Sequence, residues 1–157
     1  MPNAKRPAGP TSPRKLMEIK VGEVMNKRPQ VVHEDTSIEG LIERMVGQIQ
    51  ECFPVVDKDF RLLGIVTESD LFQVLYPQLP SETVGSTKIR EVLKYSAKTV
   101  GDIMTRRPIT ATPGMSLREA MGLMAAHKLR RLPVVEGERL VGLLSLRDII
   151  ELYRIIR

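Results

Sequence analysis

The feature that most constrains the fold of this chain is an internal repeat. The segment GLLSLRDI at 142–149 has an earlier counterpart, GIVTESDL, at 64–71. Each begins with a glycine, continues through apolar residues to a hydroxyl residue, and places an aspartate three positions later. The two halves align without a gap at an offset of 79 residues, which becomes 78 after the two Pro-Val-Val segments. A single deletion in a loop is what an internal duplication is expected to show.

Apolar periodicity predicts the same order of elements in both copies, namely strand, helix, strand, strand, helix, after a short helical turn. The elements expected in the first copy are a turn at 21–25, strands at 30–33, 53–56 and 62–67, a helix from a Thr36–Glu39 capping pattern to about 50, and a helix at 69–75. Those expected in the second are a turn at 100–104, strands at 109–111, 132–135 and 140–145, a helix at 116–127, and a helix to about 155. The predicted fold class is α+β, with two pseudo-symmetric repeats forming one unit, because one copy alone buries too little apolar surface.

The chain divides into four segments on this pattern. Residues 1–19 form a basic tail that we expect to be disordered, because it holds four prolines and little that is apolar. The first repeat covers 20–75 and the second covers 99–157. Between them, 76–98 is a linker that contains a short predicted helix at 88–97.

The net charge of +5 does not by itself indicate nucleic-acid binding. Residues 1–20 carry +4 of this charge, so the rest of the chain is almost neutral. We expect a solvated tail and no nucleic-acid partner. The sequence has neither a run of about 18 apolar residues, as a membrane helix requires, nor the apolar centre of a signal peptide, so we expect a cytoplasmic protein.

Catalytic and metal-binding chemistry are not predicted. The single cysteine, Cys52, has no evident partnership with His33 or His127, and no cluster has the spacing of metal ligands. A free cysteine entering a strand is more often a small buried apolar residue than a nucleophile. We therefore expect no enzyme activity, no metal and no required cofactor.

Three pairs of motifs resemble a known family. VMNKRP and IMTRRP, FPVVD and LPVVE, and GIVTESDL and GLLSLRDI occur in matching order and spacing. Together they span about 21–153, and the chain resembles a tandem pair of CBS domains, the Bateman module. The resemblance implies two clefts that bind adenine nucleotides or related adenosyl ligands, and association into a flat dimeric disc. It also implies regulation of an effector, which we expect to be a separate protein here.

The hydroxyl–aspartate pairs, Thr67 with Asp70 and Ser145 with Asp148, have two interpretations. A hydroxyl residue with an acid three positions later at a strand-to-helix junction caps the helix and complements its dipole. The same carboxylate can accept hydrogen bonds from the two ribose hydroxyls, while the helix N-terminus faces phosphate. The motif alone does not decide between them, and the family resemblance favours ribose binding.

The two clefts are not expected to be equal. Arg130 and Arg131 precede a strand of the second repeat, where similar family members use a basic pair to hold phosphate. The first repeat has Glu51 and Cys52 at these positions, which cannot do so. A solvated basic surface is the alternative for the arginines, and the sequence does not show which cleft they face. Apolar residues at the strand entries are the candidates for an adenine slot: Ile109, Thr110, Ala111, Leu129, Val31 and Val32.

The leading hypothesis is a regulatory module that binds an adenine nucleotide, with or without Mg²⁺, and works as a homodimer. One alternative is an interaction module with vestigial clefts, which associates through the helix that carries Met121 and Met124. The other is weak nucleic-acid binding through the tail.

Overall fold

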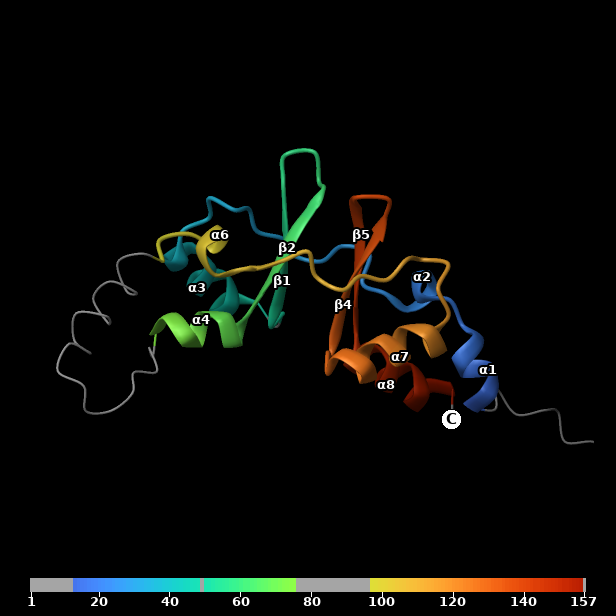
Figure 1. The fold of residues 1–157 in the computed structure, drawn as a ribbon. Helices are drawn as coiled ribbons and strands as arrows, with labels where there is room; N and C mark the ends of the chain where they lie inside the picture. Colours follow the sequence, from blue (N-terminus) through green and yellow to red (C-terminus); the bar gives the residue numbers. More distant parts are fainter. Residues whose placement is uncertain (1–12, 49, 76–96, 157) are drawn as a thin grey trace, which may run out of the picture. The chain divides into compact units, whose positions relative to one another are not determined.

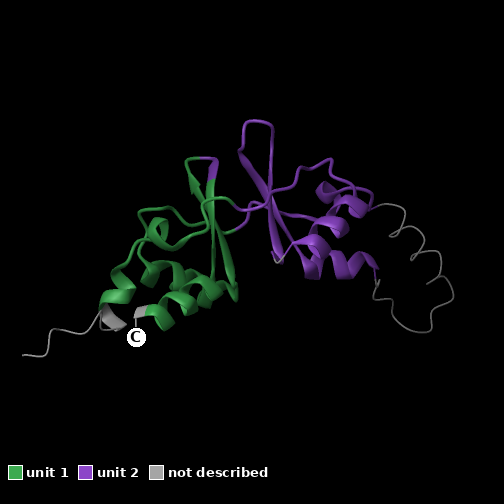
Figure 2. Ribbon diagram, turned by 180° about the vertical axis from the view of Figure 1, so that it is seen from behind, with its two compact units in different colours: residues 1–28, 109–137, 141–157 green, residues 29–108, 138–140 purple. Residues whose placement is uncertain are grey.

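The computed structural model describes residues 13–48, 50–75 and 97–156 (Figure 1). These residues form two compact units (Figure 2). Of the described residues, unit 1 contains 13–28, 109–137 and 141–156, and unit 2 contains 29–48, 50–75, 97–108 and 138–140. The units do not coincide with the sequence repeats. Unit 1 consists mainly of the second repeat but includes the first residues of the first repeat, up to residue 28, and unit 2 consists mainly of the first repeat but includes the first residues of the second, up to residue 108.

Unit 2 is built around a three-stranded antiparallel sheet. Its elements are α3 (Ile38–Gly47), β1 (Cys52–Val56), β2 (Leu62–Thr67), α4 (Glu68–Leu75), α6 (Val100–Ile103) and β3 (Thr105–Arg106). The strands lie in the order β1-β2-β3, and β3 joins through the pairs Gly64–Arg106 and Ile65–Thr105. Phe53 of β1 and Leu41 of α3 are fully buried in the core between the sheet and the helices.

Unit 1 combines two helices from the start of the chain with four elements of the second repeat. The first two are α1 (Pro13–Glu18) and α2 (Val21–Val24), and the other four are α7 (Leu117–His127), β4 (Arg131–Glu136), β5 (Arg139–Ser145) and α8 (Leu146–Ile156). Strands β4 and β5 form a two-stranded sheet, and Asn26 pairs with Leu143 beside it. The fully buried residues Leu117, Leu132 and Leu144 hold this core together.

Matched hydrogen bonds show that the two units share one backbone design. The N–H of Val32 donates to the Pro54 carbonyl at 3.0 Å, and the N–H of Ala111 donates to the Pro133 carbonyl at 2.9 Å. The carbonyls of Val32 and Ala111 in turn accept from Val56 and Val135. The predicted α+β fold with an internal repeat is therefore confirmed.

Three predicted details of secondary structure are wrong. Residues 13–18 form helix α1 instead of a disordered tail, because proline is tolerated in the first turn of a helix and Leu16, 4% exposed, packs towards α7. The cap of α3 is Ser37 instead of Thr36, with its Oγ accepting from the Gly40 N–H at 3.0 Å. The predicted strands at 30–33 and 109–111 are single parallel bridges at Val32 and Ala111.

The short bridges have a simple cause. The next bond of each parallel ladder would need a backbone N–H at Pro54 or Pro133, and proline has none. Apart from Ala97, the predicted linker helix at 88–97 lies outside the described residues. Among the residues that are described, no helix is long and apolar enough to cross a membrane.

Candidate functional site

The N-terminus of α8 carries the first candidate site. The Asp148 Oδ2 accepts a hydrogen bond from the Ser145 N–H at 3.0 Å, and the Asp148 N–H donates to the Ser145 Oγ at 3.0 Å. This reciprocal pair satisfies backbone groups that a helix start leaves without partners. The carboxylate also complements the positive end of the α8 dipole. Both residues remain partly exposed, so neither is enclosed in the core.

The N-terminus of α4 repeats this arrangement in unit 2. The Asp70 Oδ2 accepts from the Thr67 N–H at 2.9 Å and from the Thr67 Oγ1 at 3.2 Å. The Asp70 N–H lies 3.4 Å from the Thr67 Oγ1. The helix-capping interpretation of both motifs is thus confirmed, and ribose binding remains a prediction for the same carboxylates.

The strand entries lie directly beside these helix starts. In unit 1 the Leu146 N–H donates to the Arg130 carbonyl at 2.7 Å, which places the Arg130 backbone next to the Ser145–Leu146 junction. In unit 2 the Glu68 N–H donates to the Glu51 carbonyl at 3.3 Å. The structure therefore places Arg130 beside the N-terminus of α8, where Asp148 lies. Arg131, the first residue of β4, follows directly in the chain.

The predicted adenine residues divide into buried and accessible ones. Val32 and Ala111 are fully buried core residues, and their backbone N–H and carbonyl groups are used in the parallel bridges. Ile109 is 36% exposed, and Thr110 and Leu129 are partly exposed. Val31 is also partly exposed, but its carbonyl accepts from Arg44 Nη1 at 3.2 Å. Ile109, Thr110 and Leu129 of unit 1 are thus the better placed to contact a ligand.

A glutamine that sequence reasoning missed distinguishes the two units. In unit 2, Gln50 Nε2 donates to the Gln30 carbonyl at 2.7 Å and to the Cys52 carbonyl at 2.8 Å, while Gln50 Oε1 accepts from the Gln30 N–H at 3.0 Å. The glutamine supplies the donor that Pro54 lacks. In unit 1 the matching position is Leu129, whose side chain cannot donate, and Pro133 has no N–H for the Ile109 carbonyl.

A third carboxylate, Asp102, caps α6 in the same manner outside the repeated motif. Its Oδ2 accepts from the Lys98 N–H at 2.8 Å, the Thr99 N–H at 3.0 Å and the Thr99 Oγ1 at 3.3 Å. The backbone hydrogen bonds from Lys98 and then Thr99 hold the pKa of Asp102 below its usual value, against an opposing effect of desolvation.

The lowered pKa of Asp102 predicts a loss of stability in acid. A carboxyl group whose folded pKa lies below its unfolded pKa stabilises the fold above the unfolded value, about 4, and this contribution disappears as the pH falls through the folded value. Wild type should therefore be more stable than Asp102→Asn at pH 7, and the difference should shrink as the pH falls below the unfolded pKa of about 4. Chemical denaturation at each pH measures this, and a difference independent of pH would contradict it.

Among the described residues there is no group of histidine, cysteine and acidic side chains that could hold a metal ion. Cys52 is fully buried at the start of β1. The chemistry that these sites offer is carboxylate and guanidinium hydrogen bonding at helix N-termini.

Comparison with known proteins decides the family. The CBS domain matches two stretches of the chain, residues 21–77 and 100–155. The chain belongs to the CBS domain family. The two matched stretches correspond to the two repeats, so the protein contains a tandem CBS pair, as the motifs predicted.

Relatives and solved structures agree with this assignment of a CBS pair. The uncharacterised protein MJ1426 of Methanocaldococcus jannaschii is 34% identical in an alignment of 153 positions, gaps included, that covers 85% of this chain and 91% of that protein. CBSX2 of Arabidopsis thaliana, in its crystal structure with AMP, has a TM-score of 0.75 and 28% identity over 88% of this chain and 98% of its own. The CBS pair of protein MJ0100, in complex with 5′-methylthioadenosine and S-adenosyl-L-methionine, has a TM-score of 0.66 and 25% identity over 85% of this chain and 98% of its own.

Proposed function

We propose that this CBS pair is a non-catalytic regulatory module. It binds an adenine nucleotide at the helix N-terminus that carries Ser145 and Asp148, and it signals the presence of the nucleotide to a separate partner protein. The observation that carries the proposal is the position of Asp148, a partly exposed residue at the start of α8 beside the Arg130 backbone. Similar CBS pairs supply the ligand class, since CBSX2 was crystallised with AMP and MJ0100 with two adenosyl compounds.

Each part of such a ligand has a matching group in unit 1. A carboxylate can accept several hydrogen bonds, so Asp148 can hold ribose hydroxyls while Oδ2 keeps its bond to the Ser145 N–H. Arg130 and Arg131 can pair with phosphate oxygens, and the α8 N-terminus adds its dipole. Ile109 and Leu129 offer apolar surface to the base. All these roles are binding roles, and AMP needs neither a metal nor a cofactor to fill them.

Asp148→Asn is expected to weaken AMP binding about 10- to 100-fold, because hydrogen bonds to a charged group are lost, each contributing about 1.5–3 kcal/mol. Asparagine keeps an oxygen that can accept from the Ser145 N–H, so the helix cap is largely retained. Calorimetric titration of nucleotide-free protein measures the change.

The matched control is Asp102→Asn, which makes the same substitution at a capping aspartate outside the repeated motif. It should leave AMP affinity within about twofold of wild type while it changes stability. An equal loss of affinity in both variants would mean that Asp148 acts through the stability of the fold and would contradict its contact with ribose.

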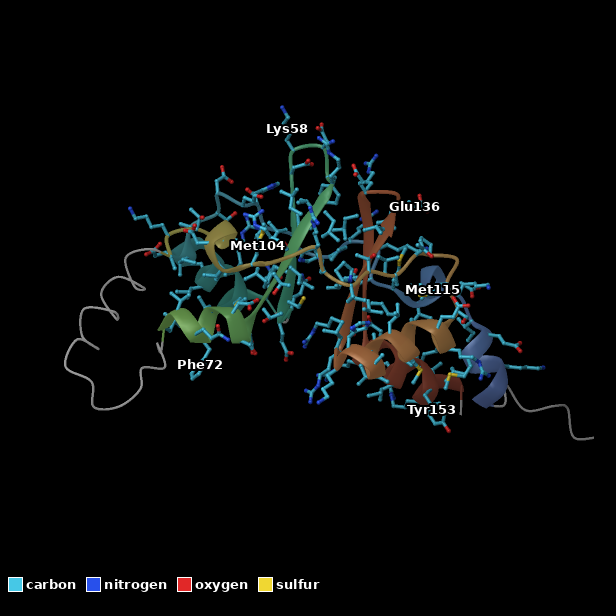
Figure 3. The ribbon with its side chains drawn as sticks, in the orientation of Figure 1. Lys58, Phe72, Met104, Met115, Glu136 and Tyr153 are labelled. Atoms are coloured by element: carbon cyan, nitrogen blue, oxygen red, sulfur yellow. The ribbon has the colours of Figure 1, made fainter. Side chains whose placement is uncertain are left out.

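We also propose that the protein works as a homodimer through α4 and α8. Phe72 and Leu75 on α4 are 55% and 62% exposed, and the equivalent residues on α8, Ile150 and Tyr153, are 59% and 48% exposed. The side chains of Phe72 and Tyr153 point outward from their helices (Figure 3). Large apolar side chains repeated at the same positions of both units are typical of an association surface.

Sedimentation should give the mass of a dimer for wild type and of a monomer for Ile150→Lys/Tyr153→Lys, because burying two lysines against apolar side chains is unfavourable. Lys58→Glu, at the exposed turn between β1 and β2, is the control and should stay dimeric. A monomeric wild type at micromolar concentrations would rule out this part of the proposal.

A further inference from the structure

The two equivalent sites carry opposite charges on the same backbone. Arg130 and Glu51 occupy matching positions, because each offers its carbonyl to the first N–H of the following helix. Around this bond, unit 1 also has Arg131 and Arg147, where the repeat alignment places Cys52 and Ser69 in unit 2. Unit 2 instead adds Glu68 as the first residue of α4.

The surroundings of the base differ as well. In unit 2, the Gln50 side chain holds both the N–H and the carbonyl of Gln30. In unit 1 the same two positions are Leu129 and Ile109. A leucine side chain cannot form these hydrogen bonds, so it does not occupy the backbone N–H and carbonyl of Ile109 in the way that Gln50 occupies those of Gln30. A base that needs apolar contact and a backbone hydrogen bond is therefore better accommodated in unit 1.

The whole units show the same difference in charge. Among the described residues, unit 1 contains 11 basic and 6 acidic residues, whereas unit 2 contains 7 basic and 11 acidic residues. The formal charges of these residues are therefore +5 for unit 1 and −4 for unit 2. A field of this kind raises the local concentration of anions near unit 1 and lowers it near unit 2.

We infer that the phosphate-bearing nucleotide binds to unit 1 alone, at one molecule per chain, and that Gln50, Glu51 and Glu68 exclude it from the equivalent position of unit 2. The inference rests on the proposed function and adds its stoichiometry and its specificity-determining residues. In unit 2 the phosphate would meet two glutamates in place of an arginine and a leucine. Like charges at a shared site disfavour binding, so a helix N-terminus alone does not make unit 2 equivalent.

Calorimetric titration with AMP tests the inference through exchanged residues. Wild type should bind one AMP per chain. Arg130→Glu, which gives unit 1 the residue of unit 2, should weaken this binding at least tenfold, whereas Arg118→Glu on the exposed surface of α7 should change it less than threefold. Circular dichroism confirms that each variant is folded.

The reverse exchange should create a second site. Gln50→Leu/Glu51→Arg/Glu68→Leu gives unit 2 the residues of unit 1 and should bind a second, weaker AMP. Its control keeps Gln50→Leu and moves the two charge changes to Glu39→Arg and Glu43→Leu on α3, and it should still bind one. Two AMP molecules per wild-type chain, or equal effects of Arg130→Glu and Arg118→Glu, would overturn the inference and leave the proposed function standing. No AMP binding by wild type would overturn both.

Discussion

Phe53→Ala is expected to lower the free energy of unfolding by about 3–5 kcal/mol, the usual cost of removing a buried aromatic ring. Phe53 is fully buried in β1 and packs in the core of unit 2 with Leu41 of α3 and Val66 of β2. The cost combines the lost burial of the ring with the cavity that the rigid surroundings leave behind. Chemical denaturation followed by circular dichroism measures it.

Val46→Ala is the control for this substitution. Val46 lies on α3 of the same unit, outside the proposed dimer surface, and is 83% exposed. Its truncation should cost less than about 1 kcal/mol, as expected for surface positions. If the two substitutions had similar effects, the described core of unit 2 would be wrong.

Gly64→Ala is expected to lower the free energy of unfolding by about 2–3 kcal/mol, because the added methyl group has no room. A Cβ at Gly64 would lie 2.6 Å from the Thr105 carbonyl oxygen and 3.0 Å from the Met104 Sδ, and Met104 is 8% exposed. The Met104 side chain can move, but the Thr105 backbone belongs to β3, which pairs with Gly64 itself. The strand must therefore shift away from β2.

Gly122→Ala provides a control of opposite sign. Gly122 lies inside α7, and a Cβ there would meet nothing within 4 Å. Alanine is favoured over glycine in a helix by about 1 kcal/mol, so this variant should be more stable than wild type. Denaturation midpoints of both variants decide the matter, and a destabilised Gly122→Ala or an unaffected Gly64→Ala would contradict the described packing.

The repeat made much of this fold predictable from sequence. The glycine, hydroxyl and aspartate of each copy occur at one spacing, and the structure places each hydroxyl–aspartate pair at the start of a helix, with matching hydrogen bonds. The helices and hairpins follow from apolar periodicity, which reports burial directly. These features depend on local sequence, so sequence alone was sufficient.

The exchange of opening segments between the units could not be predicted. Val21-Gly22 and Val100-Gly101 are identical in sequence, and both valines are fully buried. Gly22 lies against Pro113 and Gly101 lies against Glu34, each in close contact with the other repeat. Because the two Val-Gly segments have the same residues, each could pack in either unit, and the apolar periodicity does not indicate which unit each one joins.

The pair of hydrogen bonds between the Gln50 side chain and the Gln30 backbone was missed for a different reason. Its partner, the Gln30 carbonyl, needs a donor only because Pro54 lacks an N–H at the next step of a parallel ladder. That need becomes visible once 30–33 is known to run parallel to β1. The sequence signal that could have identified these bonds is a proline in the strand that pairs with residues 30–33, with a glutamine four residues before it.

The most direct test of the proposed nucleotide binding is the ¹⁵N–¹H spectrum of nucleotide-free protein during titration with AMP. Saturable shifts are expected at the amides of Ser145, Leu146 and Asp148 and of Arg130 and Arg131, with the amides of Thr67 and Asp70 much less affected. A spectrum unchanged at millimolar AMP, or shifts that avoid the start of α8, would contradict the proposal that this CBS pair binds an adenine nucleotide at that helix start.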